Sequence, residues 1–324
     1  MKAALYREYG APNVVNIEEM PLPDVEKNEV RVRVHATTVS SADSRIRAMR
    51  IPTGFKTMSR LIFGITRPKN QVLGSEFSGT VDAVGPDVTQ FNIGDTVFGA
   101  FEGRGTHAEY FSMAEDEAIE HLPTGFTHEE AAALPFGALT SLIFLRDFGH
   151  IKAGQKVLVI GASGSLGSAG VQLAAHFGAE VTGVCSTKNI ELVQSLGATR
   201  VIDYTQSNFA DEGEQYDLIY ETVGKVPFSE CKKALKPGGS CLMAVAGIPD
   251  YLRMLVNPIA GSKKLVSGVA IFKKEQLSDL KKLMEEGAIK SVIDSIHPLT
   301  DIMKAHALVD TGHKKGSVVV RVID

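Results

Sequence analysis

An apolar strand that leads directly into a glycine-rich turn restricts the fold of this 324-residue chain more than any other feature. Residues 157–160 are a continuous apolar run, which is typical of a strand covered on both faces. The run continues as Gly161-Ala162-Ser163-Gly164-Ser165-Leu166-Gly167, and small residues follow up to Gly178, which predicts a helix over 165–177. A strand, a tight glycine turn and a helix in this order begin a βαβ unit.

Further strands follow at spacings that leave room for crossover helices. The apolar runs at 181–185, 201–204, 218–221 and 241–246 predict a doubly wound parallel sheet, so the fold class is α/β. The first third of the chain has a different pattern. Val30, Val32 and Val34 alternate with polar residues, and short strands at 77–85 and 94–99 end in Gly and Asp turns, which favours a barrel-like β domain.

The turn has the chemistry of a dinucleotide site. In Ala162-x-Gly164-x-x-Gly167, Gly164 allows a pyrophosphate to approach the backbone, and Gly167 allows the helix to pack closely on the strand. The unpaired N–H groups at the helix start face the anion. The alternative is a tight strand-to-helix connection that binds nothing.

The segment after the second strand indicates which dinucleotide binds. An NAD site usually has an acid about 20 residues past the turn, but no acid lies between Glu180 and Glu191. Ser186 and Lys188 instead offer a hydroxyl and a cation to a 2′-phosphate, so NADP(H) is predicted. The alternative for Lys188 is an ordinary solvated lysine.

The composition excludes several classes of protein. Lys and Arg number 34 against 38 Asp and Glu, a formal charge of −4, which favours neither nucleic acid nor a membrane as a general partner. The three cysteines form no CxxC pair, so we expect a reducing, cytoplasmic environment. No apolar stretch reaches the length of a spanning helix.

Together, these motifs make the chain resemble the medium-chain dehydrogenase/reductase superfamily, on its zinc-independent quinone oxidoreductase (zeta-crystallin-like) side. The likeness covers nearly the whole length, through the segments 73–81, 84–85, 94–97, 131–135, 161–167 and 313–316. It implies a GroES-like catalytic domain split between residues 1–122 and 265–324, and a Rossmann domain at 123–264. A homodimer is the family expectation, and residues 265–271 are one candidate for its sheet extension.

The resemblance also implies site residues. Ser163, Ser165 and Leu166 belong to the turn, and Tyr204 matches a position that contacts the adenosine phosphate. Further cofactor contacts are implied for Thr140, Val223, Gly224, Gly247, Val269 and Lys315. Core packing, tight turns and a surface lysine are the alternative interpretations of these positions.

Zinc is not expected. The alcohol dehydrogenase branch has a catalytic Cys where this chain has Ser40 and a His where it has Ser75, and hydroxyls are poor zinc ligands. Without a metal, hydride transfer favours conjugated acceptors such as quinones and enones. Ser40 and Asp43 are the catalytic candidates. Ser40 either donates a hydrogen bond to the substrate or only fills space.

Two other functions compete with a reductase of reactive carbonyls. One is a regulatory protein that binds the cofactor and catalyses little. The other is an S-adenosylmethionine-dependent methyltransferase, because residues 216–220 and 235–239 are similar to that fold. The segment 45–69 is basic without any acid and is interleaved with apolar residues. It is either a substrate mouth or a solvated face.

Overall fold

The computed structural model describes residues 1–101, 105–260 and 263–323, which form two compact units. The terminal unit comprises Met1–Ile51, Lys56–Phe136 and Phe272–Asp324. The central unit comprises Pro52–Phe55 and Gly137–Ile271. The chain therefore leaves and re-enters the terminal unit, as the predicted split organisation requires.

The central unit is built on a six-stranded sheet in which all neighbouring strands are parallel. Its order is β10-β9-β8-β11-β12-β13, which confirms the predicted doubly wound sheet. The strands are β8 (Lys156–Ile160), β9 (Glu180–Cys185), β10 (Arg200–Asp203), β11 (Tyr216–Glu221), β12 (Leu235–Met243) and β13 (Lys264–Val266). The strand β12 begins and ends earlier than the predicted 241–246, and its register with β11 shifts between Tyr216 and Leu218.

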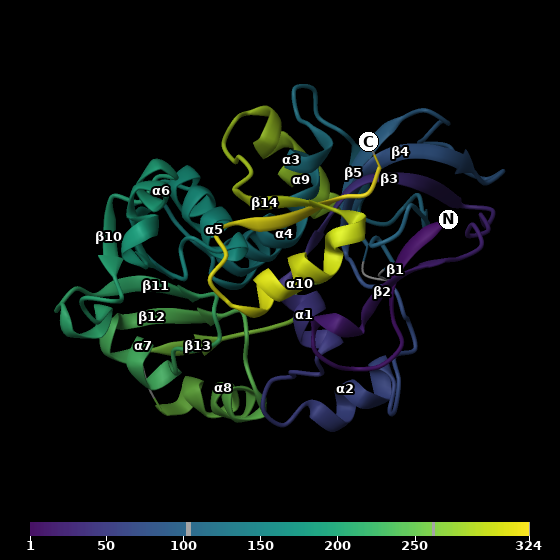
Figure 1. Ribbon diagram of the computed structural model, residues 1–324. Helices are drawn as coiled ribbons and strands as arrows, with labels where there is room; N and C mark the ends of the chain where they lie inside the picture. The colour runs from purple at the N-terminus through teal and green to yellow at the C-terminus, as the bar shows by residue number, and fades with distance from the viewer. Residues whose placement is uncertain (102–104, 261–262, 324) are drawn as a thin grey trace. The chain divides into compact units, whose positions relative to one another are not determined.

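Helices cover both faces of this sheet. In Figure 1, α5 and α6 lie above the labelled strands β11 to β13, and α7 and α8 lie below them. All four residues from Val157 to Ile160 are at most 4% exposed, as expected for a strand packed on both sides. The helices are α4 (Pro135–Leu142), which continues as the π-helix η2 (Ile143–Phe148), α5 (Ser165–His176), α6 (Ile190–Ser195), α7 (Phe228–Ala234) and α8 (Ile248–Ala260), with the short 3-10 helices η3 (Thr187–Asn189) and η4 (Phe209–Asp211).

The terminal unit joins the two ends of the chain in one sheet. Its order is β14-β15-β3-β4-β5-β7, and β6 also pairs with β3. The strand β15 is antiparallel to β3, with Val319 opposite Thr38, so yellow C-terminal strands lie beside blue and purple N-terminal ones in Figure 1. The strands of this sheet are β3 (Glu29–Val39), β4 (Glu76–Val84), β5 (Thr96–Ala100), β6 (Tyr110–Ala114), β7 (Ile119–His121), β14 (Ile293–Pro298) and β15 (Ser317–Arg321). The strands β1 (Lys2–Tyr6) and β2 (Val15–Glu19) form a separate antiparallel two-stranded sheet.

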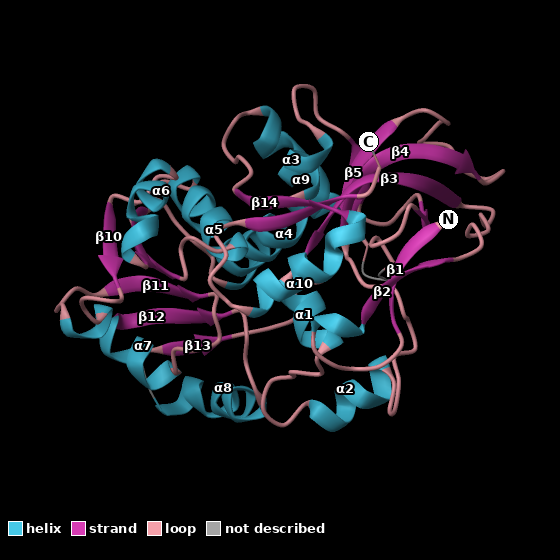
Figure 2. Ribbon diagram, viewed as in Figure 1, coloured by secondary structure: helices cyan, strands magenta, loops and turns pink. Residues whose placement is uncertain are grey.

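Short helices complete the terminal unit, as the cyan segments of Figure 2 show. Val30, Val32 and Val34 of β3 are fully buried, which confirms the predicted alternation. Thr127 caps α3 in a capping box with Glu130, as predicted. The helices are α1 (Ser41–Arg47), α2 (Lys56–Phe63), α3 (His128–Ala132), α9 (Lys274–Glu285) and α10 (Ile302–Asp310), with the turns η1 (Pro12–Val14) and η5 (Leu299–Asp301).

The unit boundaries differ from the sequence-based ones. The units divide after Phe136 and after Ile271, rather than after residues 122 and 264. The first boundary moves because Ala132 of α3 and its neighbour Ala133 pack with Ala36 and Val319 in a core cluster of the terminal unit. The second moves because β13 pairs with β12. Only the first part of the segment 265–271 is a strand, and the homodimer stays a prediction.

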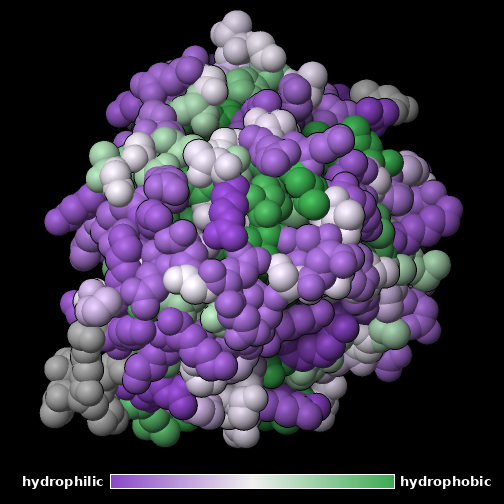
Figure 3. Space-filling model, turned by 90° about the vertical axis from the view of Figure 1, so that its left-hand side faces the viewer, coloured by the Kyte–Doolittle hydropathy of each residue, from purple (hydrophilic) through white to green (hydrophobic). Residues whose placement is uncertain are grey.

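Figure 3 views the molecule from the side on which β10 and α6 lie in Figure 1. Hydrophilic side chains predominate on this face, and hydrophobic ones appear in small groups between them. Within the described ranges, no helix has the length and apolar character that crossing a bilayer requires.

Candidate active site

The carboxyl ends of β8 and β11 meet where the sheet order of the central unit reverses direction. From β8 the chain proceeds to β9 and β10 on one side, whereas β11 leads to β12 and β13 on the other. Such a switch point is the usual ligand-binding position of an open α/β sheet. Thr222 Oγ1 donates to the carbonyl oxygen of Ile160 at 2.7 Å, which fixes the turn after β11 to the end of β8.

The three glycines of the turn after β8 have different tasks. Gly161 has a φ of +79°, a conformation that favours glycine. A Cβ on Gly167 would lie 2.0 Å from the carbonyl oxygen of Gly161, so the packing of α5 requires this glycine. Gly164 has an ordinary φ of −78°, and its Cβ would meet only the Gly161 oxygen at 3.4 Å. The protein itself does not require glycine at 164, which supports a site where a ligand approaches the backbone.

The start of α5 is held by its neighbour α4. Gly164 is the N-cap of α5, and no side chain caps it. Ser141 Oγ donates to the carbonyl oxygen of Leu166 at 2.8 Å, so the predicted residue Thr140, which is 7% exposed, lies in the turn of α4 next to this contact. A helix start without a capping side chain is suited to bind a pyrophosphate.

Asn189 connects the two predicted serines of the site. Its amide nitrogen donates to Ser163 Oγ at 3.0 Å and contacts Ser186 Oγ at 3.3 Å. Asn189 is 7% exposed and was not recognised from the sequence, although it follows Ser186 by a single turn. Lys188 is exposed beside it. The loops after β8 and β9 thus present hydroxyls and an ammonium group together.

The end of β10 lies against the same loop. Tyr204 donates its backbone N–H to the carbonyl oxygen of Cys185 and is 56% exposed. Asp203 also lies here, and its carboxylate accepts hydrogen bonds from Thr187 and Thr205. These bonds, with Thr187 first, lower the pKa of Asp203. The Asp203 carboxylate therefore lies near the predicted 2′-phosphate position, but both of its oxygens accept hydrogen bonds from hydroxyl groups.

Glu221 shapes the turn that contains Val223 and Gly224. Its buried carboxylate accepts the backbone N–H of Val223 at 3.0 Å and that of Gly224 at 2.8 Å. Burial raises its pKa, and these hydrogen bonds oppose the rise. The sequence contained a signal for this residue, because Glu221 directly follows the apolar residues of β11 and so lies at the end of a buried strand.

The remaining predicted cofactor residues occupy separate places. Gly247 precedes α8, and a Cβ there would lie 2.9 Å from the carbonyl oxygen of Thr53. Val269, between β13 and the end of the central unit, is 77% exposed. Lys315 belongs to the terminal unit and is exposed, and its backbone N–H donates to Asp294 Oδ1. Within the central unit, the structure groups the residues after β8, β9, β10 and β11.

Ser40 and Asp43, the catalytic candidates, form a capping box at the start of α1 in the terminal unit. Asp43 donates its backbone N–H to Ser40 Oγ, and the Ser40 hydroxyl donates to Asp43 Oδ2 at 2.5 Å. Asp43 also accepts the backbone N–H of Gly74 at 3.0 Å. Burial raises the pKa of Asp43, but the charge of His107 and the hydrogen bonds from Ser40 lower it by more than burial raises it. The pKa of Asp43 therefore lies below its ordinary value. Because the hydroxyl of Ser40 has one proton and Asp43 accepts it, this geometry favours a structural role for both residues.

Glu76 is a buried titratable group that sequence reasoning missed. It is 2% exposed, accepts a hydrogen bond from the Thr38 hydroxyl, and accepts the backbone N–H of Phe136 at 2.7 Å. Burial raises its pKa to about 7. Burial also lowers the pKa of Lys314 to about 8, against the attraction of Glu76. The predicted residue of this motif was Lys315, one position further on.

The donor groups do not suit zinc. The hydroxyl of Ser40 is bound to Asp43, and Ser75 offers only another hydroxyl. No group of three His, Cys, Asp or Glu residues that could hold a metal ion occurs in the described part of the chain. Cys185, Cys231 and Cys241 are buried, and burial raises the pKa of Cys185 to about 11.

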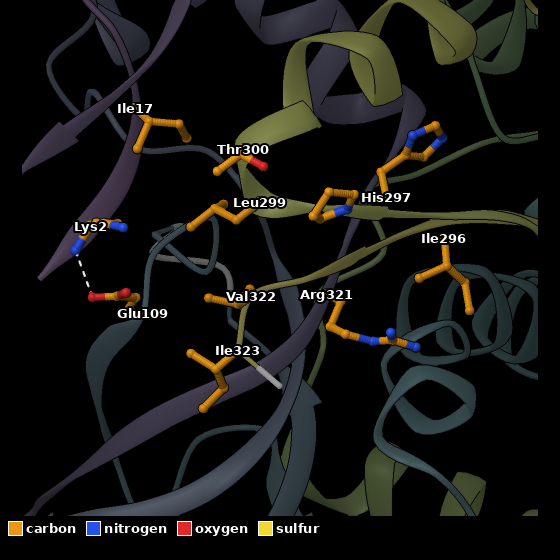
Figure 4. A pocket seen from close by; sticks show the side chains of 11 residues that line it. Lys2, Ile17, Glu109, Ile296, His297, Leu299, Thr300, Arg321, Val322 and Ile323 are labelled. Carbon is orange, nitrogen blue, oxygen red and sulfur yellow. Dashed lines mark hydrogen bonds between the residues drawn. The ribbon is translucent and has the colours of Figure 1, made fainter.

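A surface pocket of about 440 Å³ lies elsewhere in the terminal unit. Figure 4 shows Leu299 and Val322 in its apolar part, with Lys2 and Arg321 at the sides, and none of the predicted site residues lines it. The backbone N–H of Lys2 donates to Glu109. We assign this pocket no role.

Comparisons with known proteins agree with this arrangement. Residues 26–125 match the alcohol dehydrogenase GroES-like domain, and residues 196–320 match a zinc-binding dehydrogenase family. The chain is 33% identical over 334 residues to a chloroplast envelope quinone oxidoreductase homolog of Arabidopsis thaliana, covering 99% of this chain and 98% of that protein. It is 31% identical to a 2-methylene-furan-3-one reductase of Solanum lycopersicum, covering 100% of this chain and 79% of that one.

A solved structure also has this fold. The quinone oxidoreductase from Coxiella burnetii superposes with a TM-score of 0.88 at 28% identity, covering 100% of this chain and 99% of that chain. The chain belongs to the medium-chain dehydrogenase/reductase superfamily, in its quinone oxidoreductase-like branch. This family uses NAD(P)H. The methyltransferase alternative is therefore wrong.

Proposed function

We propose that this protein is an NADPH-dependent reductase of quinones, enones or related reactive carbonyls. One observation supports it most: Gly164, Ser186 and Lys188 lie at the ends of neighbouring strands. The fold does not require a glycine at position 164, and the ammonium group of Lys188 is exposed. A pyrophosphate needs the first of these features and a 2′-phosphate the second. The nucleotide supplies a hydride when bound.

The residues of the central unit divide the binding between them. The backbone at Gly164 and the start of α5 bind the pyrophosphate, while Asn189 holds the hydroxyls of Ser163 and Ser186 in place. Lys188 binds the 2′-phosphate as a charge-assisted donor. Thr187 and Thr205 occupy the oxygens of Asp203, which reduces its repulsion of that phosphate.

The proposed substrates follow from the chemistry of the donors. Ser40 and Ser75 offer hydroxyls in the places where a metal-dependent relative would have zinc ligands, so the acceptor carbon must already be electron-poor. Two relatives support this class. One is named as a quinone oxidoreductase homolog, and the compound in the name of the other is a ketone conjugated with a methylene group.

Titration of the purified protein with NADPH and NADH, followed by nicotinamide fluorescence, tests the nucleotide. We expect Lys188→Glu to weaken NADPH binding by roughly tenfold or more and NADH binding much less, since it replaces attraction with repulsion. Lys233→Glu, at an exposed position of α7, is the matched control. Equal losses for both nucleotides would contradict a 2′-phosphate contact.

A panel of quinones, enones and aldehydes tests the reaction. Oxidation of NADPH by conjugated acceptors, and little with simple aldehydes, is the expected result. NADPH binding without consumption by any of these compounds would favour the regulatory alternative.

A further inference from the structure

The helix α2 carries an apolar stripe that faces away from the core. Met58, Leu61, Ile62 and Ile65 are 51%, 60%, 56% and 59% exposed. Met58, Leu61 and Ile62 lie at i, i+3 and i+4 on one side of α2, which ends at Phe63, and Ile65 follows just after the helix, beyond Gly64 with its φ of +124°. The opposite side is the one that packs, because Ser59 is buried and Phe63 contacts a core cluster. In Figure 1, α2 lies below β1 and β2 of the terminal unit.

Cations border this stripe, and no acid lies nearby in the sequence. Lys56, Arg60, Arg67 and Lys69 lie within the segment 56–69, and residues 45–75 contain no Asp or Glu. Lys69 Nζ donates to the carbonyl oxygen of Leu61 at 2.7 Å, and Arg60 donates to that of Ile65 at 2.9 Å. Both acceptors are neutral carbonyl oxygens, so these bonds hold the two cations beside the stripe without neutralising their charge.

We propose that the segment 56–69 docks on an anionic lipid surface, with the apolar stripe in the interface and the cations at the headgroups. An exposed amphipathic helix with basic flanks has the character of an interfacial anchor. The net charge of −4 for the whole chain does not by itself predict binding to an anionic surface. However, a surface senses mainly the charges within about 10 Å, and residues 45–75 of the chain contribute only positive ones.

Charge also argues against a second copy of the chain on this stripe. A two-fold contact brings the same patch of both copies together. Four cations of one segment would then face four of the other, with no acid in residues 45–75 to compensate them. An anionic surface satisfies both the apolar and the basic residues.

Sedimentation of the full chain with vesicles tests this proposal. We expect binding to phosphatidylcholine vesicles that contain phosphatidylserine, little binding to phosphatidylcholine alone, and weakening by salt. Lys56→Gln with Arg67→Gln lowers the affinity by about 25-fold, since each cation contributes about fivefold. Leu61→Ser with Ile62→Ser lowers it by at least about tenfold.

Matched controls separate the segment from the general surface. Ile93→Ser removes an apolar side chain that is 68% exposed. Lys282→Gln with Lys304→Gln removes two cations whose side chains are 70% and 66% exposed. Neither control should change vesicle binding.

Three results would overturn the proposal. They are no binding to anionic vesicles, equal binding to neutral ones, and equal losses in the control variants. Self-association of the wild type that Leu61→Ser with Ile62→Ser abolishes, without any vesicle binding, would assign the stripe to a second copy instead.

Discussion

At the scale of single residues, Glu76 is a buried group for which we expect a large effect of pH on stability. Its folded pKa of about 7 lies above its ordinary value of 4.5 because burial disfavours the charged form. A carboxyl group with a raised folded pKa stabilises the fold while protonated. Its contribution is complete below pH 4.5 and is lost as the pH rises to about 7.

Glu76→Gln should remove this dependence. A glutamine can accept the backbone N–H of Phe136 and donate to the Thr38 hydroxyl, so it replaces the protonated acid. We expect the variant and the wild type to be about equally stable at pH 4.5, and the variant to be more stable by about 3 kcal/mol above pH 7. Denaturant unfolding of both proteins across this range measures the difference. A constant difference at all pH values would contradict the raised pKa.

Single residues also show what sequence reasoning missed. Ser186 and Lys188 are predicted because their types suit a phosphate, and this stays a prediction. Asn189 was missed because its amide contacts other side chains. The surroundings of Glu76 and Asp203 are set by the pairing of β-strands and by turns. Neither the composition of the chain nor the spacing of its motifs predicts these pairings. Asp203 lies opposite Cys185 in the register of β9 and β10, although 18 positions separate them in the sequence.

At the scale of elements, the turn before α5 provides two substitutions with opposite consequences. Gly167→Ala puts a Cβ 2.0 Å from the Gly161 oxygen and should cost about 1 to 3 kcal/mol or more of stability. Gly164→Ala adds a Cβ at an ordinary distance of 3.4 Å, so we expect a loss below about 1 kcal/mol but NADPH binding weakened about tenfold or more. Unfolding curves and nucleotide titrations of both variants measure this. Unchanged NADPH binding in Gly164→Ala would contradict the pyrophosphate assignment.

The cap of α1 distinguishes the two interpretations of Ser40. Ser40→Ala removes an N-cap acceptor and a donor to Asp43, so we expect stability to fall by about 1 to 2 kcal/mol. If the hydroxyl only caps the helix, turnover of the folded variant stays nearly unchanged. A fall of about 100-fold in kcat with normal stability would instead identify Ser40 as a donor to the substrate. Thr127→Ala, in the exposed capping box of α3, is the control for a cap alone.

Most elements could be predicted because their patterns are local. The apolar run of β8 and the capping box of α3 each depend on a few neighbouring residues, and both are confirmed. The boundary after Phe136 could not be predicted, because it depends on Ala132 packing with Val319, a residue near the other end of the chain.

At the scale of the whole molecule, the two units differ in how they depend on chain continuity. The central unit takes nearly all its residues from Gly137–Ile271, including the complete six-stranded sheet. The terminal unit needs both ends of the chain, since β15 completes the sheet beside β3. Half of the buried residues of one terminal-unit cluster come from its last segment: Leu299, Ile302, Ala305, Val309, Val318 and Val320.

We therefore expect opposite behaviour from two fragments. The fragment 137–271 should unfold cooperatively and bind NADPH, because it retains the sheet, the turn and Lys188, although it loses the bond from Ile248 to Thr53. The fragment 1–136 should show no cooperative transition, because β3 then lacks its partner β15 and half of that core cluster is missing. Circular dichroism during denaturant unfolding measures both, and adding the segment 272–324 by co-expression should restore the transition of the second fragment. A cooperative transition of 1–136 alone would mean that β3 to β7 form a stable core without the C-terminal strands.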